Sequence, residues 1–256
     1  MVKILLAGFN GSMGQKAITM INETPEFELV AVYAPSADQP ASAYGLSDSV
    51  KVFNDLATID SDADVWIDFT VPDSVYADTK FAIEHGYHPV VGTTGLTDDQ
   101  EAELIKLSQQ KQLGGLIAPN FGLSAVLLMK FAKQAAQYFP DVEVIEMHHE
   151  DKKDAPSGTA LSTAKMIDEV RTPHEQGDSK ETLAGSRGGD YHGIRIHAVR
   201  LPGYVAHEQV LFGGSGEALT IRQDSFDRSS FMQGVKVAVK NVKKLPELVV
   251  GLENLL

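Results

Sequence analysis

Apolar residues in the first half of the chain fall into short continuous runs, separated by longer segments whose apolar positions recur every three or four residues. A continuous run that ends in glycine or proline is typical of a buried strand, and the longer period is typical of an amphipathic helix. Their alternation predicts a parallel sheet with helical crossovers, a doubly wound α/β domain. The expected strands are residues 2–7, 27–33, 52–53, 65–69, 88–91 and 116–118, and the expected helices are residues 12–22, 74–84 and 98–111.

The pattern changes after Asn120. Later strands alternate polar with apolar positions, which is typical of a sheet with one covered face and therefore of a mixed or antiparallel sheet. We expect a smaller α+β domain with a mixed sheet. Its expected helices are residues 124–138 and 159–170, its expected strands are residues 142–147, 194–200, 208–212 and 218–222, and a polar, glycine-rich stretch covers residues 172–192.

A final helix is expected at residues 228–243, and we expect it to pack back on the first domain. That would make the first domain discontinuous, formed by residues 1–120 and 228–256, with the second domain formed by residues 121–227. The two crossing segments, near Asn120 and Asp227, would then act as a hinge of the kind on which ligand-binding domains close.

Composition excludes several classes of function. The formal net charge of −13 over 256 residues argues against nucleic acid or an anionic membrane as a partner. No stretch approaches the roughly 20 apolar residues that span a bilayer, and the apolar start is too short for a signal peptide. The absence of cysteine excludes disulfides and thiolate metal sites, and it fits a reducing cytoplasm.

Glycines follow the first expected strand with the spacing Gly-x-x-Gly-x-x-Gly. Such glycines let the backbone pass close to a pyrophosphate and direct helix N–H groups at it. Alone the spacing is also that of a tight turn, but after the first strand of an α/β domain it indicates a Rossmann-type nucleotide-binding domain. The expected cofactor contacts here are Gly8, Phe9, Asn10, Gly11, Ser12, Met13, Gly14 and Lys16.

The end of the second strand bears on which dinucleotide binds. An acidic residue there normally holds the adenosine ribose hydroxyls, but this strand ends in Tyr33, Ala34 and Pro35. Asp38 lies further along the loop, and Lys16 could pair with a phosphate. We therefore expect NADPH, or NADPH and NADH without strong discrimination.

The segment from Glu143 to Ala160 holds two histidines, two lysines and a Pro-Ser-Gly-Thr turn between a strand and a helix. The strand end anchors side chains rigidly, and the helix start binds anions through its N–H groups and dipole. His148 can ionise near neutral pH, and Lys152 can donate to a carboxylate or a ring nitrogen. Singly, adjacent lysines suggest a solvated loop and Ser157 a helix cap. Together the histidines, the lysines and the turn predict a site for a small carboxylate substrate that is protonated during reaction.

This segment resembles the signature of the dihydrodipicolinate reductases of bacterial lysine and diaminopimelate synthesis. The resemblance implies reduction of 4-hydroxy-tetrahydrodipicolinate, a small dicarboxylate, to tetrahydrodipicolinate by NADPH or NADH. It also implies a cytoplasmic homotetramer that assembles through the sheet of the second, substrate-binding domain. The matching positions are Glu143, Val144, Glu146, His148, Lys152, Asp154, Pro156, Ser157, Gly158, Thr159 and Ala160.

The resemblance also assigns roles to residues. His148 would be the acid/base residue and Lys152 the proton donor or the cation that polarises the substrate, and the division of proton transfer between them stays open. A substrate carboxylate would be held by His149, Ser157, Gly158 and Thr159. The nicotinamide site would be lined by Gly92, Thr93, Thr94, Ala118, Pro119, Asn120 and Phe121, with Thr94 also near the substrate and Arg228 close to the cofactor. Without the resemblance, residues 92–95 would be a helix cap and residues 118–122 a linker.

Three alternatives are set against this hypothesis. Glu143, Glu146 and Asp154 could form a metal site with the histidines, but nicotinamide reduction needs no metal, and none is expected. Another two-domain NAD(P)-dependent amino-acid dehydrogenase would not need Lys152 together with residues 156–159. A non-enzymatic nicotinamide-sensing protein could lose both His148 and Lys152. The histidines given no role are His174, His192, His197 and His207.

Overall fold

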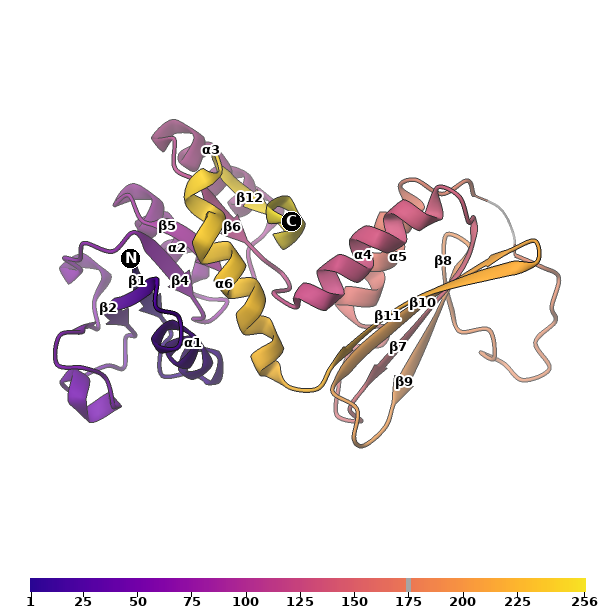
Figure 1. Cartoon of the computed structure of the whole chain (residues 1–256), viewed down its shortest axis with the longest axis horizontal. Coiled ribbons are helices and arrows are strands. Elements are labelled where there is room, and N and C mark those ends of the chain that lie inside the picture. Colours follow the sequence, from indigo (N-terminus) through magenta and orange to yellow (C-terminus); the bar gives the residue numbers. More distant parts are fainter. Residues whose placement is uncertain (174–175) are drawn as a thin grey trace. The chain divides into compact units, whose positions relative to one another are not determined.

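The structure, a computed structural model, describes residues 1–173 and 176–256 (Figure 1). His174 therefore lies outside the described residues. The chain divides into two compact units, one formed by Met1–Phe121 with Phe231–Leu256 and the other by Gly122–Ser230. Within the described residues, no helix has both the length and the apolar content needed to cross a membrane.

The first unit is built on a seven-stranded parallel sheet with the strand order β12-β6-β5-β4-β1-β2-β3 (Figure 1). The order reverses between β1 and β4, and ligands of such sheets bind beyond the carboxyl ends of the strands at this switch point. Both strands are buried almost throughout, as expected for a sheet covered on both faces. The strands are β1 Val2–Ala7, β2 Phe27–Tyr33, β3 Lys51–Phe53, β4 Val65–Asp68, β5 His88–Val91, β6 Gly115–Ile117 and β12 Leu248–Val250.

Four α-helices belong to this unit. α1 contacts α6, and α2 contacts α3. Leu5 of β1 and Trp66 of β4 share one apolar cluster with Ala82 of α2. α3 begins with a capping box formed by Thr97 and Gln100, whereas α1 begins at Gly11 with no side-chain cap. The helices are α1 Ser12–Asn22, α2 Val75–Glu84, α3 Asp98–Lys111 and α6 Phe231–Asn241.

The C-terminal segment differs from the sequence prediction. The expected helix at residues 228–243 is a 3-10 turn at Arg228–Ser230, then α6, then a second 3-10 turn at Val242–Lys244. After it, β12 pairs in parallel with β6 at the edge of the sheet, and the sequence pattern does not predict this strand. Three residues are too few to show a periodic pattern. This strand is therefore recognised only by its pairing with β6.

The second unit holds a five-stranded mixed sheet with the order β11-β10-β7-β9-β8. β7 pairs with β9 in parallel and all other pairs are antiparallel, so the predicted mixed sheet is confirmed. β8 lies in the glycine-rich stretch and was not predicted. The elements are α4 Leu123–Ala136, β7 Asp141–His148, α5 Gly158–Asp168, β8 Gly189–Tyr191, β9 Ile194–Arg200, β10 Ala206–Gly214 and β11 Glu217–Ser225.

The two faces of this mixed sheet differ in burial. Along β7, Val142, Val144 and Glu146 are buried, whereas Glu143 and Ile145 are partly exposed. Because successive side chains on a strand point to opposite faces, the first three share one face. α4 contacts β10 and β11, and α5 contacts β7, so these helices cover the buried face. On the other face Met147 is buried, whereas Glu143 and Ile145 keep partial exposure.

Candidate active site

The glycine loop between β1 and α1 is shaped by close backbone approaches. Gly8 has a φ of +74°, and a β-carbon there would lie 2.2 Å from the carbonyl oxygen of Phe69. A β-carbon at Gly14 would lie 2.3 Å from the carbonyl oxygen of Gly8, but one at Gly11 would find no atom closer than 3.4 Å. Gly8 and Gly14 are thus required by the loop itself. Gly11 keeps the outer side of the loop open at the uncapped start of α1, where helix N–H groups favour an anion.

The other predicted contacts in this loop differ in exposure. Phe9 is fully buried and packs edge-to-face on Tyr44 with ring centroids 5.1 Å apart, so only its backbone can face a ligand. The amide of Asn10 donates to the hydroxyl of Ser36 at 2.9 Å, which ties the loop to the segment after β2. Ser12 is exposed, and Met13 and Lys16 are half-buried.

Ala34, at the end of β2, is 3% exposed and offers neither a charge nor a hydrogen bond from its side chain. Asp38 is exposed, and its backbone N–H donates to the Tyr44 hydroxyl at 3.0 Å. The strand end that usually grips the adenosine ribose is therefore apolar in this chain.

Asp68, the last residue of β4, joins the carboxyl ends of two neighbouring strands. It is fully buried, and its Oδ1 accepts from the hydroxyls of Thr70 and Thr93, each at 2.7 Å. The indole N–H of Trp66 donates to its Oδ2 at 3.2 Å. Sequence reasoning missed Asp68, although an acidic residue that closes a buried apolar run was a usable signal. Through Thr93 it fixes the loop that follows β5.

The loops after β5 and β6 pack together through aromatic rings. A β-carbon at Gly92 would lie 2.4 Å from the Phe69 ring and 2.9 Å from that of Phe121. The Ala118 N–H donates to the carbonyl of Val91 at 2.9 Å. The structure thus brings residues 92–94 and 118–121 to the same edge of the sheet. Ala118 and Phe121 are buried, Thr93 and Asn120 are half-buried, and Thr94 and Pro119 are exposed.

In the second unit, the last residue of β7 is His148, and its imidazole is held by a buried carboxylate. Its Nδ1 lies 2.5 Å from Oε2 of Glu146, which is fully buried. Arg200 donates to the two oxygens of Glu146 at 2.7 and 2.8 Å, and the Ser157 N–H donates at 3.0 Å. Burial alone would raise the pKa of Glu146, but the hydrogen bonds from His148 and Arg200 outweigh it and lower the pKa to about 2. Glu146 therefore stays ionised and fixes the orientation of the imidazole.

Arg200 is a site residue that sequence reasoning missed. It ends β9, opposite His148 in the parallel pairing of β7 with β9, and also donates to the carbonyl of Asp154 at 2.7 Å. Nothing in the local sequence marks it, because 54 residues separate it from Glu146. Glu146 could have been found from the sequence. It lies two residues before His148 on the same strand, so the two side chains point to the same face.

The turn into α5 already binds one carboxylate of the chain. Lys152 Nζ lies 2.7 Å from Oδ1 of Asp154. The pKa of Asp154 is held below its usual value chiefly by that hydrogen bond, with a contribution from the backbone N–H of Gly158. This lysine and the first turn of α5 thus form a set of donors suited to a carboxylate.

The remaining residues of this turn have distinct positions. Ser157 is 2% exposed, and its hydroxyl accepts from the Ala160 N–H at 3.2 Å, so the side chain caps α5. A β-carbon at Gly158 would have no neighbour within 4 Å, which leaves that side of the turn open. His149 and Lys153 are exposed, and Thr159 is half-buried.

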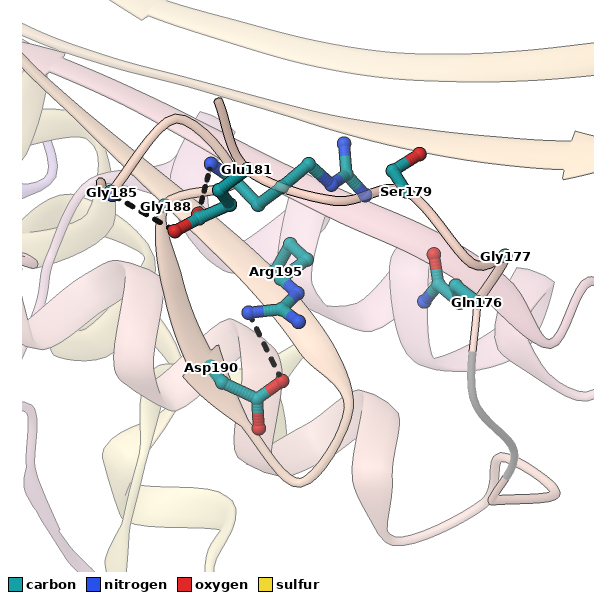
Figure 2. A pocket seen from close by; sticks show the side chains of 9 residues that line it. Gln176, Gly177, Ser179, Glu181, Gly185, Gly188, Asp190 and Arg195 are labelled. Atoms are coloured by element: carbon teal, nitrogen blue, oxygen red, sulfur yellow. Dashed lines mark hydrogen bonds and ion pairs between the residues drawn. The ribbon is translucent and has the colours of Figure 1, made fainter. Parts of the chain in front are cut away.

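A separate cavity of about 360 Å³ lies among the loop before β8 and the strands β8 and β9 (Figure 2). Figure 2 shows the carboxylate of Glu181 receiving backbone N–H groups, from Gly185 at 3.0 Å and Arg187 at 2.8 Å. Arg195 pairs with Asp190 at 3.5 Å. Its lining holds two arginines and two acids, and none of the predicted catalytic residues lines it. We do not place the reaction there.

Three further candidates are Arg228, a metal site and the histidines without an assigned role. Arg228 is exposed and belongs to the second unit. Among the described residues no group of three or more histidine or acidic side chains is arranged to hold a metal ion. Three histidines without an assigned role pair with a carboxylate, namely His192 with Asp168, His197 with Glu143 and His207 with Asp224.

A parallel sheet with a glycine loop at its switch point, joined to a mixed-sheet unit with a carboxylate-held histidine, defines a two-domain oxidoreductase with a Rossmann-type half. Comparison with known families gives two matches, "Dihydrodipicolinate reductase, N-terminus" over residues 2–121 and "Dihydrodipicolinate reductase, C-terminus" over residues 124–256. The chain belongs to the dihydrodipicolinate reductase family, so its dinucleotide is a nicotinamide cofactor.

Individual relatives agree with this assignment. The chain is 64% identical over 256 residues to the 4-hydroxy-tetrahydrodipicolinate reductase of Lactobacillus acidophilus, covering 99% of this chain and 98% of that protein. It is 64% identical over 259 residues to that of Limosilactobacillus fermentum, covering the whole of both. A solved structure, the dipicolinate-bound dihydrodipicolinate reductase from Paenisporosarcina sp. TG-14, matches with a TM-score of 0.92 and 47% identity over all of both chains.

Proposed function

We propose that this protein reduces 4-hydroxy-tetrahydrodipicolinate to tetrahydrodipicolinate with NADPH or NADH, a step of lysine and diaminopimelate synthesis. The observation that carries the proposal is the end of β7, where the imidazole of His148 is held by ionised Glu146. It is followed within a few residues by a turn whose donors already hold the carboxylate of Asp154. A proton-exchanging group beside a carboxylate site is what reduction of this substrate requires.

The substrate is a small dicarboxylate. The relative of known structure has dipicolinate bound, a planar molecule with two carboxylates. We infer that one substrate carboxylate takes the place of Asp154 at the start of α5, held by Gly158, Thr159 and the capped turn of Ser157. Exposed His149 contributes from the loop, and exposed Thr94 of the first unit completes the set that the family resemblance assigns.

When bound, the reduced nicotinamide supplies a hydride to the substrate carbon. The glycine loop between β1 and α1 suits the pyrophosphate of this cofactor. Gly14 packs closely on the backbone of Gly8, which fixes the loop, whereas a β-carbon at Gly11 would meet no atom closer than 3.4 Å, so the surface there is open to a ligand. The proton that balances the hydride comes from His148 or Lys152, and the overall reaction also releases the 4-hydroxyl group of the substrate as water. Glu146 keeps Nδ1 of His148 engaged, so Nε2 is the nitrogen that exchanges a proton, and Lys152 polarises the substrate.

We infer a preference for NADPH or a dual use of both cofactors. Buried Ala34 presents no negative charge that would repel a 2′-phosphate and no acceptor for a free 2′-hydroxyl. Lys16 in the first turns of α1 supports the phosphate-bearing cofactor, and exposed Arg228 is a further candidate contact.

We propose that the protein acts as a cytoplasmic homotetramer assembled through the partly exposed face of the mixed sheet. That face carries half-exposed apolar residues, among them Ile145 and Leu211, which an interface would bury. The absence of cysteine supports a reducing compartment.

The direct test is a coupled assay. A dihydrodipicolinate synthase generates the substrate from pyruvate and aspartate semialdehyde, and loss of reduced-nicotinamide absorbance is followed with NADH and NADPH side by side. Turnover is the expected result. A folded protein that binds cofactor yet turns over neither would refute the proposal and favour a nicotinamide-sensing role.

A further inference from the structure

Glu208 of β10 is a second buried acid beside the candidate site. In the register of the sheet it lies directly opposite Glu146 of β7 on one side and Gln223 of β11 on the other. All three side chains are at most 7% exposed and lie in one row on the face that α4 and α5 cover. Two carboxyl groups are thus neighbours in a buried region.

The two acids differ in their partners. Glu146 is compensated by Arg200, His148 and a backbone N–H. Among the described residues, the Glu208 side chain has one hydrogen-bond partner, the hydroxyl of Thr163 on α5, 2.5 Å from its Oε1. Two ionised carboxylates cannot share one cation-poor site without a large cost, so one of them is expected to hold a proton.

The contacts of Thr163 indicate that the proton is on Glu208. Its Oγ1 lies 2.5 Å from Glu208 and also 3.0 Å from the carbonyl oxygen of Thr159. A hydroxyl has one proton, and a carbonyl oxygen only accepts. Both contacts are full hydrogen bonds when Thr163 donates to the carbonyl and a protonated Glu208 donates to Thr163. Burial supports this, because it raises the pKa of Glu208 to about 7, with the charge of Glu146 adding to the rise and Thr163 opposing it.

The surroundings of Glu208 contain little that could compensate its charge. Glu146 is the titratable group that acts on it from β7, while Gln223 faces it from β11 and Thr163 from α5. The Arg200 guanidinium and the His148 imidazole are directed at Glu146. Ionisation of Glu208 therefore adds an unpaired negative charge behind the first turn of α5.

That turn is the proposed carboxylate site, and Glu208 reaches it through Thr163 and the carbonyl of Thr159. We propose that Glu208 is a proton-dependent positioning residue. Its neutral form supports the bound dicarboxylate, and its ionised form weakens binding of that dicarboxylate. The inference rests on the proposed function.

The test measures the dissociation constant of dipicolinate by calorimetry from about pH 6 to about pH 8.5. In the unaltered protein it should rise roughly tenfold, the order of magnitude of one like charge at an effective dielectric near 20. Binding near pH 7.5 should take up a proton, detected as a dependence of the heat on the buffer's ionisation enthalpy. Glu208→Gln, which stays neutral, should lose most of this rise and most of the uptake. The remainder belongs to other titratable groups.

A matched control is Glu217→Gln, which removes an exposed carboxylate from β11 of the same sheet and should keep the full pH dependence. If Glu208→Gln fails to fold, nuclear magnetic resonance of the unaltered protein with carboxyl-labelled glutamate decides. One glutamate should titrate near pH 7, and titration of all of them below about pH 5 would overturn the inference.

The two proposals fail in different ways. Dipicolinate binding with the same pH dependence in Glu208→Gln and the unaltered protein overturns the role of Glu208 and leaves the proposed function standing. No dipicolinate binding and no turnover by the unaltered protein overturns the proposed function, and the role of Glu208 with it.

Discussion

Glu146 and His148 lie two residues apart on β7, and the carboxylate of the first is 2.5 Å from Nδ1 of the second. The same carboxylate accepts two hydrogen bonds from Arg200 and one from the Ser157 N–H. One buried charge thus sets the imidazole and the start of α5 at once. A change at Glu146 should therefore disturb proton transfer and carboxylate binding together.

Replacing Glu146 with glutamine tests this coupling. The variant keeps the shape of the side chain but removes the charge that fixes the imidazole and pairs with Arg200. We expect kcat to fall about a hundredfold and KM for the dicarboxylate to rise, as followed in the coupled assay. Cofactor affinity, measured by fluorescence titration, should not change. An unaltered kcat would contradict the role given to Glu146.

Acid stability should depend on Glu146 as well. Its pKa is about 2 in the folded protein against an ordinary value of 4.5. A lowered folded pKa contributes stability that is complete above the unfolded value and is lost as the pH falls toward the folded one. The shift corresponds to about 3 kcal/mol of unfolding free energy. Urea unfolding between about pH 3 and about pH 6 should show this loss, and Glu146→Gln should show a flatter dependence over the same window.

Lys152 and Lys153 form a matched pair. Lys152 is partly buried and pairs with Asp154, whereas Lys153 is exposed. Lys152→Ala should lower turnover about a hundredfold or more without changing cofactor affinity, because the glycine loop belongs to the other unit. Lys153→Ala should behave like the unaltered protein. Full turnover by Lys152→Ala would mean that the proton and polarising roles lie elsewhere.

Replacing Gly14 or Gly11 of the cofactor loop with alanine should have different effects on stability and on cofactor binding. A β-carbon at Gly14 would overlap the backbone of Gly8 at 2.3 Å, so Gly14→Ala should lower unfolding free energy by about 1–3 kcal/mol or more. At Gly11 a β-carbon would fit without a clash inside the loop, so Gly11→Ala should keep its thermal midpoint. It should bind the dinucleotide more weakly, because the added methyl group lies on the side that the ligand approaches. Equal losses of stability would contradict the assignment of Gly11 to ligand approach.

Cofactor choice should respond to Ala34. Ala34→Asp supplies an acceptor for the ribose hydroxyls and a charge that repels a 2′-phosphate. The ratio of kcat/KM for NADPH to that for NADH should fall at least about tenfold, the effect of about 1.4 kcal/mol. Asp38→Asn is the comparison, since Asp38 is the exposed acid further along the same loop. A change of ratio in that variant alone would assign cofactor choice to Asp38.

Much of the first unit could be predicted because its strands are continuous buried runs. Val65 to Asp68 and Val2 to Ala7 read as strands from composition alone, since helices cover both of their faces. β12 could not be found in this way, because Leu248–Val250 is a strand only by its pairing with β6. Local pattern identifies elements that carry their own period, and short edge strands carry none.

The site was predictable where its residues are contiguous in sequence. His148, Lys152 and Ser157 lie in one short segment from the end of β7 to the start of α5, so their spacing pointed to chemistry. Arg200 and Glu208 come from β9 and β10, and only the register of the sheet places them beside Glu146. The sequence around Arg200 or Glu208 does not indicate which residue of a distant strand each will contact.

The strand β12 also has a consequence for biosynthesis. The sheet of the first unit is complete only when Leu248–Val250 joins β6, and α6 and a 3-10 turn precede this strand in the sequence. Residues 122–230, which form the second unit, leave the ribosome before α6 and this strand. Since chains emerge from their amino end, the inserted unit can fold cotranslationally while the surrounding one still waits for its last strand. The inserted unit can therefore be complete before the unit whose sequence begins first.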